Sequence, residues 1–232
     1  MAVDVGSIGA AKDVAEYITS VLGKSLDTLR YIAATHFHID HIGGIGYLLK
    51  KCHVSPTILF HKKIREYTAG KRRISLIRNW RTGLVPASIA SMRNVRRLSH
   101  FGFQSLAGIP LPGVRTFTSL SFDETEIVYF GQEPGRRYPL GFDDWEVIET
   151  PGHTEDSLCF FYRATGELIA GDLIVNIVRK GRGQLNRFHW SKNNMRESYA
   201  YLMNTIRPKT IHPGHGDSVE DSENALLAVT TF

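Results

Sequence analysis

Apolar and polar positions alternate along the first quarter of the chain in a way that predicts short strands and amphipathic helices. A first helix is predicted where apolar residues recur at helical spacing, before Gly23 ends it: Val14, Tyr17, Ile18, Val21 and Leu22. Residues 31–35 are a short apolar strand, residues 42–52 a second helix, and residues 57–60 another strand that ends at His61.

The remaining three quarters repeat this alternation after an interruption. Residues 62–110 lack clear strands and are predicted to form one or two basic helices. Strands are then predicted at 114–118, 126–130 and 145–150, and residues 157–162 and 167–170 form a predicted hairpin. A helix spans Met195 to Ile206 before Pro208, a strand covers 210–212, and a last helix covers about 219–229. Strands alternating with helices predict an α/β layered fold.

Composition is that of an ordinary globular protein. The 232 residues, 42% hydrophobic and 22% charged, suffice for one sizeable domain, which we expect to span 1–232 with a basic, mostly helical insertion at about 62–110. No apolar run approaches the ~18 residues of a membrane helix, and no secretory signal is visible. We therefore expect a cytoplasmic protein in which Cys52 and Cys159 are free thiols.

Charge is concentrated in one segment. Residues 61–100 hold eleven Lys and Arg against one acid, Glu66, whereas the rest of the chain is mildly acidic. The basic segment 62–97 is compatible with a lid over a site, with a surface for nucleic acid or anionic membrane, or with a solvated helical face. Its aromatic residues, Tyr67 and Trp80, are too few for a single-strand stacking platform, so nucleic acid binding is disfavoured.

The first candidate chemistry is a cluster that follows the strand at 31–35. His36, His38, Asp40 and His41 place three imidazoles and a carboxylate within six residues. Imidazole nitrogen and carboxylate oxygen are the usual ligands of Zn²⁺. The spacing predicts that His36 and His38 grip one ion and that Asp40 and His41 grip a second, with Gly43 and Gly44 allowing the chain to turn into the next helix.

Three further positions repeat the theme later in the chain. His153 in Pro-Gly-His-Thr, Asp172 in Gly-Asp and His215 in Pro-Gly-His-Gly each directly follow a predicted strand. Residues at the ends of separate strands, carried on glycine-rich loops, are how α/β folds build sites. His212 lies near His215, but only His215 has the flanking glycines, so we favour His215.

Together, the order His-x-His-x-Asp-His, PGHT, GD and PGHG resembles the metallo-β-lactamase superfamily of metal-dependent hydrolases. The resemblance covers residues 3 to about 217 and implies a four-layer αββα sandwich of two mixed β-sheets. It also implies that His36, His38 and His153 bind one metal, that Asp40, His41 and His215 bind the second, and that Asp172 bridges both. Asp4 matches the family's Asp-x-Gly turn and is expected to support the ligands from a second layer.

The resemblance departs from the family at the start of the chain. Family members have a pair or more of strands before the Asp-x-Gly turn, whereas here the turn begins three residues after Met1, so the N-terminal strands are shortened. Either the start of the chain is misplaced or shortened, or another chain covers the exposed sheet edge. A homo-oligomer is one expected outcome, because an unprotected edge strand invites association.

The resemblance implies a two-metal mechanism. Two divalent ions, most simply Zn²⁺ with Fe or Mn as alternatives, would share a bridging hydroxide that attacks an electrophilic carbonyl or phosphorus. Asp40 would orient this nucleophile and Asp172 would hold the ions together. Cations in the loop 173–190, including Arg187, favour a small anionic substrate, and His189 is the best single candidate for a substrate contact.

Four functions remain open at this stage. The leading one is hydrolysis of a small ester, thioester, lactone or related acid derivative. The second is a phosphodiesterase or nuclease, which preferential phosphodiester cleavage would support. The third is an iron-dependent redox enzyme on the same fold, because His and carboxylate also suit iron. A non-catalytic binding module is disfavoured because all seven ligand positions are intact.

Overall fold

The computed structural model describes residues 1–75, 85, 89, 92, 95–107, 118–123, 127–131, 135–177 and 182–232. The chain divides into two compact units, which are described in turn. Unit 1 comprises Met1–Ile74 and Val95–Gln132, and unit 2 comprises Ser75–Asn94 and Glu133–Phe232. The organisation of 1–232 as a single domain stays a prediction. Most of the predicted strand 114–118 and much of the basic segment 62–97, Trp80 included, lie outside the described residues.

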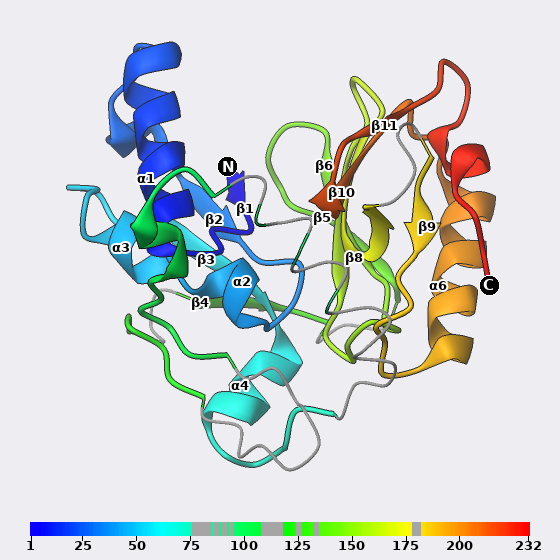
Figure 1. Ribbon diagram of the computed structural model, residues 1–232, viewed down its shortest axis with the longest axis horizontal. Coiled ribbons are helices and arrows are strands. Elements are labelled where there is room, and N and C mark those ends of the chain that lie inside the picture. The colour runs from blue at the N-terminus through cyan, green and yellow to red at the C-terminus, as the bar shows by residue number, and fades with distance from the viewer. Residues whose placement is uncertain are drawn as a thin grey trace. The chain divides into compact units, whose positions relative to one another are not determined.

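Unit 1 contains a sheet whose strands run in the order β1-β2-β3-β4, with helices between them (Figure 1). Its strands and helices are β1 (Ala2–Val3), α1 (Ile8–Glu16), a π-helical turn (Tyr17–Val21), 3₁₀ turns (Leu26–Thr28 and Leu98–Phe101), β2 (Tyr31–Ala33), α2 (Ile39–Ile42), α3 (Ile45–Leu49), β3 (Thr57–His61), α4 (Lys62–Thr68) and β4 (Ile127–Phe130). Every described strand pair in this sheet is parallel. Parallel strands are connected by crossovers, which here carry the helices.

The core of unit 1 forms because β2 and β3 are almost continuously apolar. Ile32, Ile58 and Phe60 are completely buried and pack in one cluster with Ile45 and Leu48 of α3. A central parallel strand is covered on both faces and therefore reads as an apolar run rather than an alternating one. This core fixes the end of β2, from which the first candidate cluster emerges.

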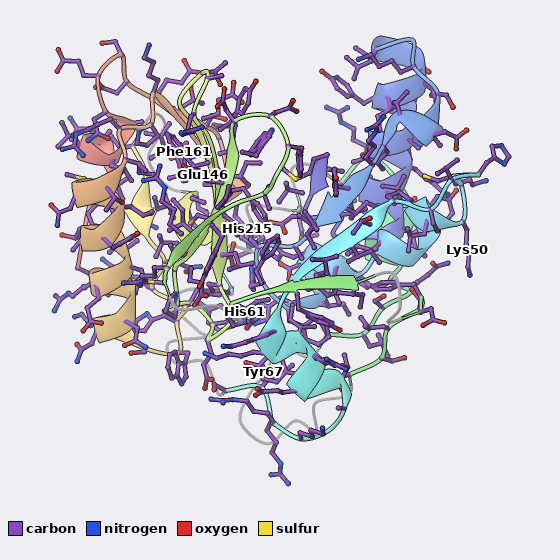
Figure 2. All side chains as sticks on the ribbon, turned by 180° about the vertical axis from the view of Figure 1, so that it is seen from behind. Lys50, His61, Tyr67, Glu146, Phe161 and His215 are labelled. Atoms are coloured by element: carbon purple, nitrogen blue, oxygen red, sulfur yellow. The ribbon has the colours of Figure 1, made fainter. Side chains whose placement is uncertain are left out.

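The first part of the basic segment forms helix α4. In α4, Ile64 and Tyr67 are buried, whereas Lys62 and Arg65 are exposed. Tyr67 lies on α4 just after His61, which ends β3 (Figure 2). The described basic residues of α4 therefore form a solvated face over an apolar one, as in an ordinary amphipathic helix.

Unit 2 contains a mixed sheet with the strand order β11-β10-β8-β7-β6-β5, and β9 pairs with β8. Its strands and helices are β5 (Arg137–Pro139), β6 (Trp145–Glu149), β7 (Leu158–Tyr162), β8 (Glu167–Asn176), β9 (Gln184–Leu185), α6 (Lys192–Thr205), β10 (Thr210–Gly216), β11 (Val219–Glu220) and a 3₁₀ turn (Ala225–Ala228). The predicted hairpin is confirmed as the antiparallel pair β7 and β8. Strand β10 pairs with β8 in parallel.

Helix α6 covers one face of this sheet, as Figure 1 shows. Its buried residues, Met195, Ser198 and Leu202, lie at helical spacing, and Met195 and Leu202 pack in one core cluster with Ile148 and Ile211. The Ser191 side chain caps the helix by accepting from the Asn194 N–H. The helix therefore sits where its apolar stripe meets the apolar face of the strands.

Some predicted elements differ from those observed. The fold class, α/β with two sheets, is confirmed. The last helix, predicted at about 219–229, was wrong: Val219 and Glu220 form β11 against β10, and only Ala225–Ala228 turns helically. The helix predicted at 42–52 is two short helices, α2 and α3, and the first begins at Ile39. Among the described residues, no helix combines the length and apolar character that crossing a bilayer requires.

Candidate metal centre

The first cluster follows β2 and is anchored by the aromatic residue between its first two histidines. Phe37 is buried, and its ring contacts those of Phe60 (centroids 6.5 Å apart) and Tyr67 (6.1 Å). The chain bends at residues 35–37, and the rings of His36 and His38 lie next to each other with centroids 4.5 Å apart. The Nε2 atom of His36 lies 2.9 Å from Nδ1 of His38.

Asp40 and His41 lie on α2, whereas the sequence predicted that the next helix would begin after them, at residue 42. A short helix places these consecutive residues about 100° apart, so that they can still face one region. His41 is buried, whereas the Asp40 side chain is 40% exposed, and His41 Nε2 lies 3.9 Å from Asp40 Oδ2. Asp40 is therefore the solvent-facing acid of the first cluster.

The Asp-x-Gly turn packs directly against α2. A Cβ atom on Gly6 would lie 2.0 Å from the carbonyl oxygen of Asp40, and one on Gly44 would lie 2.1 Å from that of Ser7. Gly43 and Gly44 were expected to give the chain freedom to turn, but both have ordinary negative φ angles of −62° and −99°. Gly44 is needed for close approach to the turn, and not for an unusual backbone conformation.

Asp4 contacts more of the first cluster than its position in the sequence indicates. Its backbone has φ of 60°, a left-handed conformation that Asp tolerates better than most residues. Its Oδ1 accepts from the Thr35 N–H at 2.7 Å, and its Oδ2 accepts from the Thr35 hydroxyl at 2.8 Å and contacts His41 Nδ1 at 2.9 Å. Thr35 Oγ1 in turn lies 3.1 Å from His36 Nδ1. Thr35 was not singled out from the sequence; its place directly before His36 was the only signal.

The polar contacts of His36 and His41 indicate which nitrogen of each ring carries the proton. A carboxylate only accepts, so the approach of Asp4 Oδ2 to within 2.9 Å of His41 Nδ1 favours the tautomer of His41 that carries its proton on Nδ1. The Thr35 hydroxyl gives its hydrogen to Asp4, so it can only accept from the Nδ1–H of His36. Both neutral rings are thereby left with a lone pair on Nε2, the state in which imidazole binds a metal.

The second cluster lies in unit 2 and centres on Asp172. His153 follows β6 in a loop, as predicted, but Asp172 lies within β8 and His215 within β10, and not after these strands. Strand β8 continues to Asn176 because Ile174 and Val175 pair with β9, and β10 continues because its last residues pair with β8 across irregular register. Figure 2 labels His215 in unit 2.

The two oxygens of Asp172 face different histidines. His153 Nε2 lies 3.3 Å from Asp172 Oδ2, and His215 Nε2 lies 3.5 Å from Oδ1. Tetrahedral ligands at about 2.0–2.1 Å from one Zn²⁺ lie roughly 3.3–3.4 Å from each other, which matches both separations. A Cβ on Gly214 would lie 2.1 Å from Asp172 Oδ1, so the glycine before His215 leaves room for this carboxylate.

In unit 2, residues outside the candidate ligand set hydrogen-bond to the candidate ligands and hold them in place. His153 Nδ1 lies 2.6 Å from the Phe188 carbonyl oxygen, which can only accept, so Nε2 is again the atom left to bind. The Asn186 amide donates to Asp172 Oδ2 at 3.4 Å. The His153 loop is pressed onto α6: the Ser198 hydroxyl donates to the Pro151 carbonyl at 2.7 Å, and a Cβ on Gly152 would lie 2.5 Å from Met195 Cα. Asn186 and Phe188 were not identified from the sequence.

The other candidates occupy different surroundings. His212 hydrogen-bonds to Ser218 at 3.0 Å and lies 3.8 Å from Glu167, away from Asp172's partners. Arg187 is exposed. His189 is buried, and its ring stacks on Phe232. Cys52 and Cys159 are thiols, as predicted.

A sequence model of one protein family matches most of the chain. A sequence model of the metallo-beta-lactamase superfamily matches residues 3–215. No curated protein is significantly similar to the chain. Among solved structures, MEM-A1, a subclass B3 metallo-beta-lactamase from a soil metagenome library, is similar with a TM-score of 0.52 and 19% identity, over 91% of this chain and 67% of that one.

A second solved structure shows the same fold at low identity. A metallo-beta-lactamase from Pontibacter korlensis gives a TM-score of 0.52 with 14% identity, over 94% of this chain and 73% of that one. An archaeal superfamily protein, ST1585 from Sulfolobus tokodaii, gives 0.49 with 19% identity over 82% of this chain. This chain spans only 62% of the length of the archaeal protein.

Proposed function

The chain belongs to the metallo-β-lactamase superfamily, and on this premise we propose that it is a hydrolase with two divalent metal ions. In this proposal one ion is held by His36, His38 and His153. The second is held by Asp40, His41 and His215, and Asp172 ligates both. The order and type of all seven residues along the chain support the assignment.

The observation that carries the proposal is the placement of Asp172. Its two oxygens face His153 and His215 separately, at distances expected for ligands that share an ion. A carboxylate that served only as a hydrogen-bond acceptor would not need one histidine on each oxygen. The arrangement of His153, Asp172 and His215 therefore fits a carboxylate that ligates two ions.

The orientation of the histidine rings also fits metal binding. His41 and His153 have Nδ1 next to Asp4 and the Phe188 carbonyl respectively, which leaves Nε2 as the donor atom. His36 Nδ1 contacts Thr35 in the same way, and its Nε2 lies 2.9 Å from His38 Nδ1, beside a second candidate ligand. Such outer contacts fix the tautomer and raise the basicity of metal-binding histidines. Nitrogen-rich ligation favours zinc, with iron and manganese as alternatives.

When bound, two divalent ions lower the pKa of water toward neutrality and polarise the oxygen of the scissile group. Asp40 has a different role from Asp172, because it is the exposed carboxylate among the proposed ligands. It can accept a hydrogen bond from the attacking water and so orient it toward the substrate. Asp172 is buried, and holding the centre together is the role left for it.

The proposed substrates are small esters, thioesters, lactones or related acid derivatives that carry negative charge. Arg187 and Arg182 are exposed on the loop after Asp172, and cations there would favour an anion. Arg179 and Lys180 of this loop lie outside the described residues. His189 and Arg187 remain candidate substrate contacts.

The proposal is tested with metal-loaded protein on a panel of carboxylic esters, thioesters, lactones and phosphodiesters. We expect turnover of an anionic carboxylic substrate and a loss of roughly 10²-fold or more in kcat for Asp40→Asn. The control is Asp144→Asn, because Asp144 is a half-exposed acid that pairs with Arg163 in unit 2, whereas Asp40 lies on α2 of unit 1. Preferential phosphodiester cleavage would favour the nuclease alternative, and no turnover at any metal loading would contradict the proposal.

A further inference from the structure

Residues 184–191, here called the bracing loop, contact two of the three candidate ligands of unit 2. Asn186 donates to Asp172, and the Phe188 carbonyl accepts from His153 Nδ1. The backbone N–H groups of Trp190 and Ser191 also donate to the carbonyls of His153 (2.9 Å) and Gly152 (3.0 Å). The position of the bracing loop therefore sets where both ligand side chains point.

The bracing loop is held in shape by its own residues. Asn186 Oδ1 accepts from the Phe188 N–H at 3.0 Å, and His189 Nδ1 lies 3.3 Å from the Asn186 carbonyl oxygen. The Asn186 N–H donates to the Leu173 carbonyl, next to Asp172, at 3.2 Å. Asn186 thus connects the two ligand contacts, and the His189 ring closes the loop behind it.

The last residues of the chain lie against this loop. Figure 1 shows them beside α6, and residues 229–232 are here called the tail segment. Thr230 donates its N–H to the Gly183 carbonyl at 2.8 Å and accepts from the Leu185 N–H at 3.0 Å. The tail segment is therefore hydrogen-bonded to the chain on both sides of Gln184, where the bracing loop begins.

Phe232 is fastened at three points. Its ring stacks on His189 with centroids 5.3 Å apart and an interplanar angle of 14°. The ammonium of Lys192 lies 5.1 Å from the ring centroid, and Arg196 Nε donates to the Phe232 main-chain oxygen at 2.9 Å. Both cations come from the exposed side of α6, so an apolar ring is held at a polar surface by directed contacts.

We propose that Phe232 is a positioning residue of the metal centre and that it acts through His189 and the bracing loop. The inference rests on the proposed function, because it assumes that His153 and Asp172 bind metal. It differs from that function in assigning part of the metal affinity to an aromatic residue outside the candidate ligand set. Stacking on Phe232 restricts the His189 ring, and this in turn restricts Asn186 and the Phe188 carbonyl.

The test is Co²⁺ binding to the apo form of the full chain, followed by the visible absorption of the ion. We compare Phe232→Ala with Phe232→Tyr, which keeps the stacked ring, and with Leu227→Ala, which removes an exposed side chain from the preceding 3₁₀ turn. Loss of an outer-layer contact weakens metal affinity by roughly 10–100-fold. Because Phe232 acts through His189 and not on a ligand directly, we expect Phe232→Ala to weaken Co²⁺ affinity by about tenfold and to change the intensity of the visible bands. The affinity of the other two variants should change by less than about twofold.

A double-substitution cycle with His189→Ala separates positioning from general stability. If Phe232 acts through His189, the double variant binds Co²⁺ no more weakly than His189→Ala alone, so the two losses do not add. Additive losses would overturn the proposed route. Wild-type affinity and spectrum in Phe232→Ala would overturn the inference itself, as would an equal loss in Leu227→Ala.

The same titration distinguishes this inference from the function on which it rests. If the wild-type chain binds no Co²⁺, the metal centre itself is wrong and the positioning role fails with it. If the wild type binds two ions per chain and Phe232→Ala does so equally well, only the positioning role is wrong. Circular dichroism of each apo variant shows whether a loss reflects unfolding, and Phe232→Tyr then supplies the folded comparison.

Discussion

Replacing Asp4 with Asn should impair the second metal ion while leaving the fold intact. Asn tolerates the φ of 60° at this position as well as Asp does, so the turn itself should not be strained. Oδ1 can still accept from the Thr35 N–H, but the position of Oδ2 becomes an NH₂ group. That group faces the Thr35 hydroxyl, which donates to Asp4 in the wild type, and His41 Nδ1, which lies 2.9 Å from Asp4 Oδ2.

The magnitude follows from these two contacts. An amide donor at Oδ2 favours the tautomer of His41 in which Nδ1 carries the lone pair and Nε2 carries the proton, and protonated Nε2 cannot bind metal. Restoring the wild-type tautomer leaves two donors facing each other and removes the contact of His41 with a charged carboxylate, for which the value of a hydrogen bond to a charged group, about 1.5–3 kcal/mol, sets the scale. At 1.4 kcal/mol per factor of ten, metal affinity should fall by about 10–100-fold, the range typical of outer-layer contacts.

The assay is competition for Zn²⁺ against a chromogenic chelator, with the thermal stability of the apo form measured in parallel. We expect one of the two ions to bind more weakly in Asp4→Asn while the apo transition stays close to that of the wild type. Asp27→Asn is the control for metal affinity, since Asp27 is an acid of the same unit that accepts hydrogen bonds from the Ser25 hydroxyl and the backbone N–H groups of His53 and Val54. Unchanged affinity for both ions in Asp4→Asn would refute the tautomer reasoning.

Two further predictions concern single positions. Gly214→Ala should weaken metal binding and activity by about 10²-fold. The new Cβ would lie 2.1 Å from Asp172 Oδ1 and must displace that carboxylate by about an ångström. Wild-type metal content with normal turnover would contradict this prediction. The backbone N–H groups of His53 and Val54 lower the pKa of Asp27, so its stabilisation is present above the unfolded pKa of about 3.9 and is lost as the pH falls through the folded value. Asp27→Asn should flatten the acid side of a plot of Tm against pH, and a plot that is parallel to the wild type would exclude this role.

The sequence predicts elements well where one stretch contains the whole signal. The apolar run at Tyr31–Ala33 and the helical spacing of Met195 and Leu202 each reflect packing of that stretch against its own core. The predicted helix at 219–229 failed because Val219 pairs with Ile211 of β10, a contact that no local pattern records. Distant pairing decided the conformation there, as it commonly overrides propensity.

The residues of the candidate site also fall into two groups, those that the sequence reveals and those that only the folded chain reveals. Histidines and carboxylates in motif order were visible in the sequence because metal binding demands those residue types. Thr35 and Asn186 were not, since hydroxyl and amide side chains occur everywhere and only the folded chain brings them to His36 and Asp172. The carbonyl of Phe188 has no sequence signal at all, because every residue carries one.

The central claim is tested most directly by the metal content of the protein, purified without added metal and measured by elemental analysis beside His38→Ala. The account predicts about two divalent ions per chain in the wild type, zinc before iron or manganese, and a lower content in His38→Ala. Two irons per chain would keep the centre and replace the hydrolase proposal with a redox one. A wild-type chain that holds no stoichiometric metal, even after reconstitution with Zn²⁺, Fe²⁺ or Mn²⁺, would contradict the account.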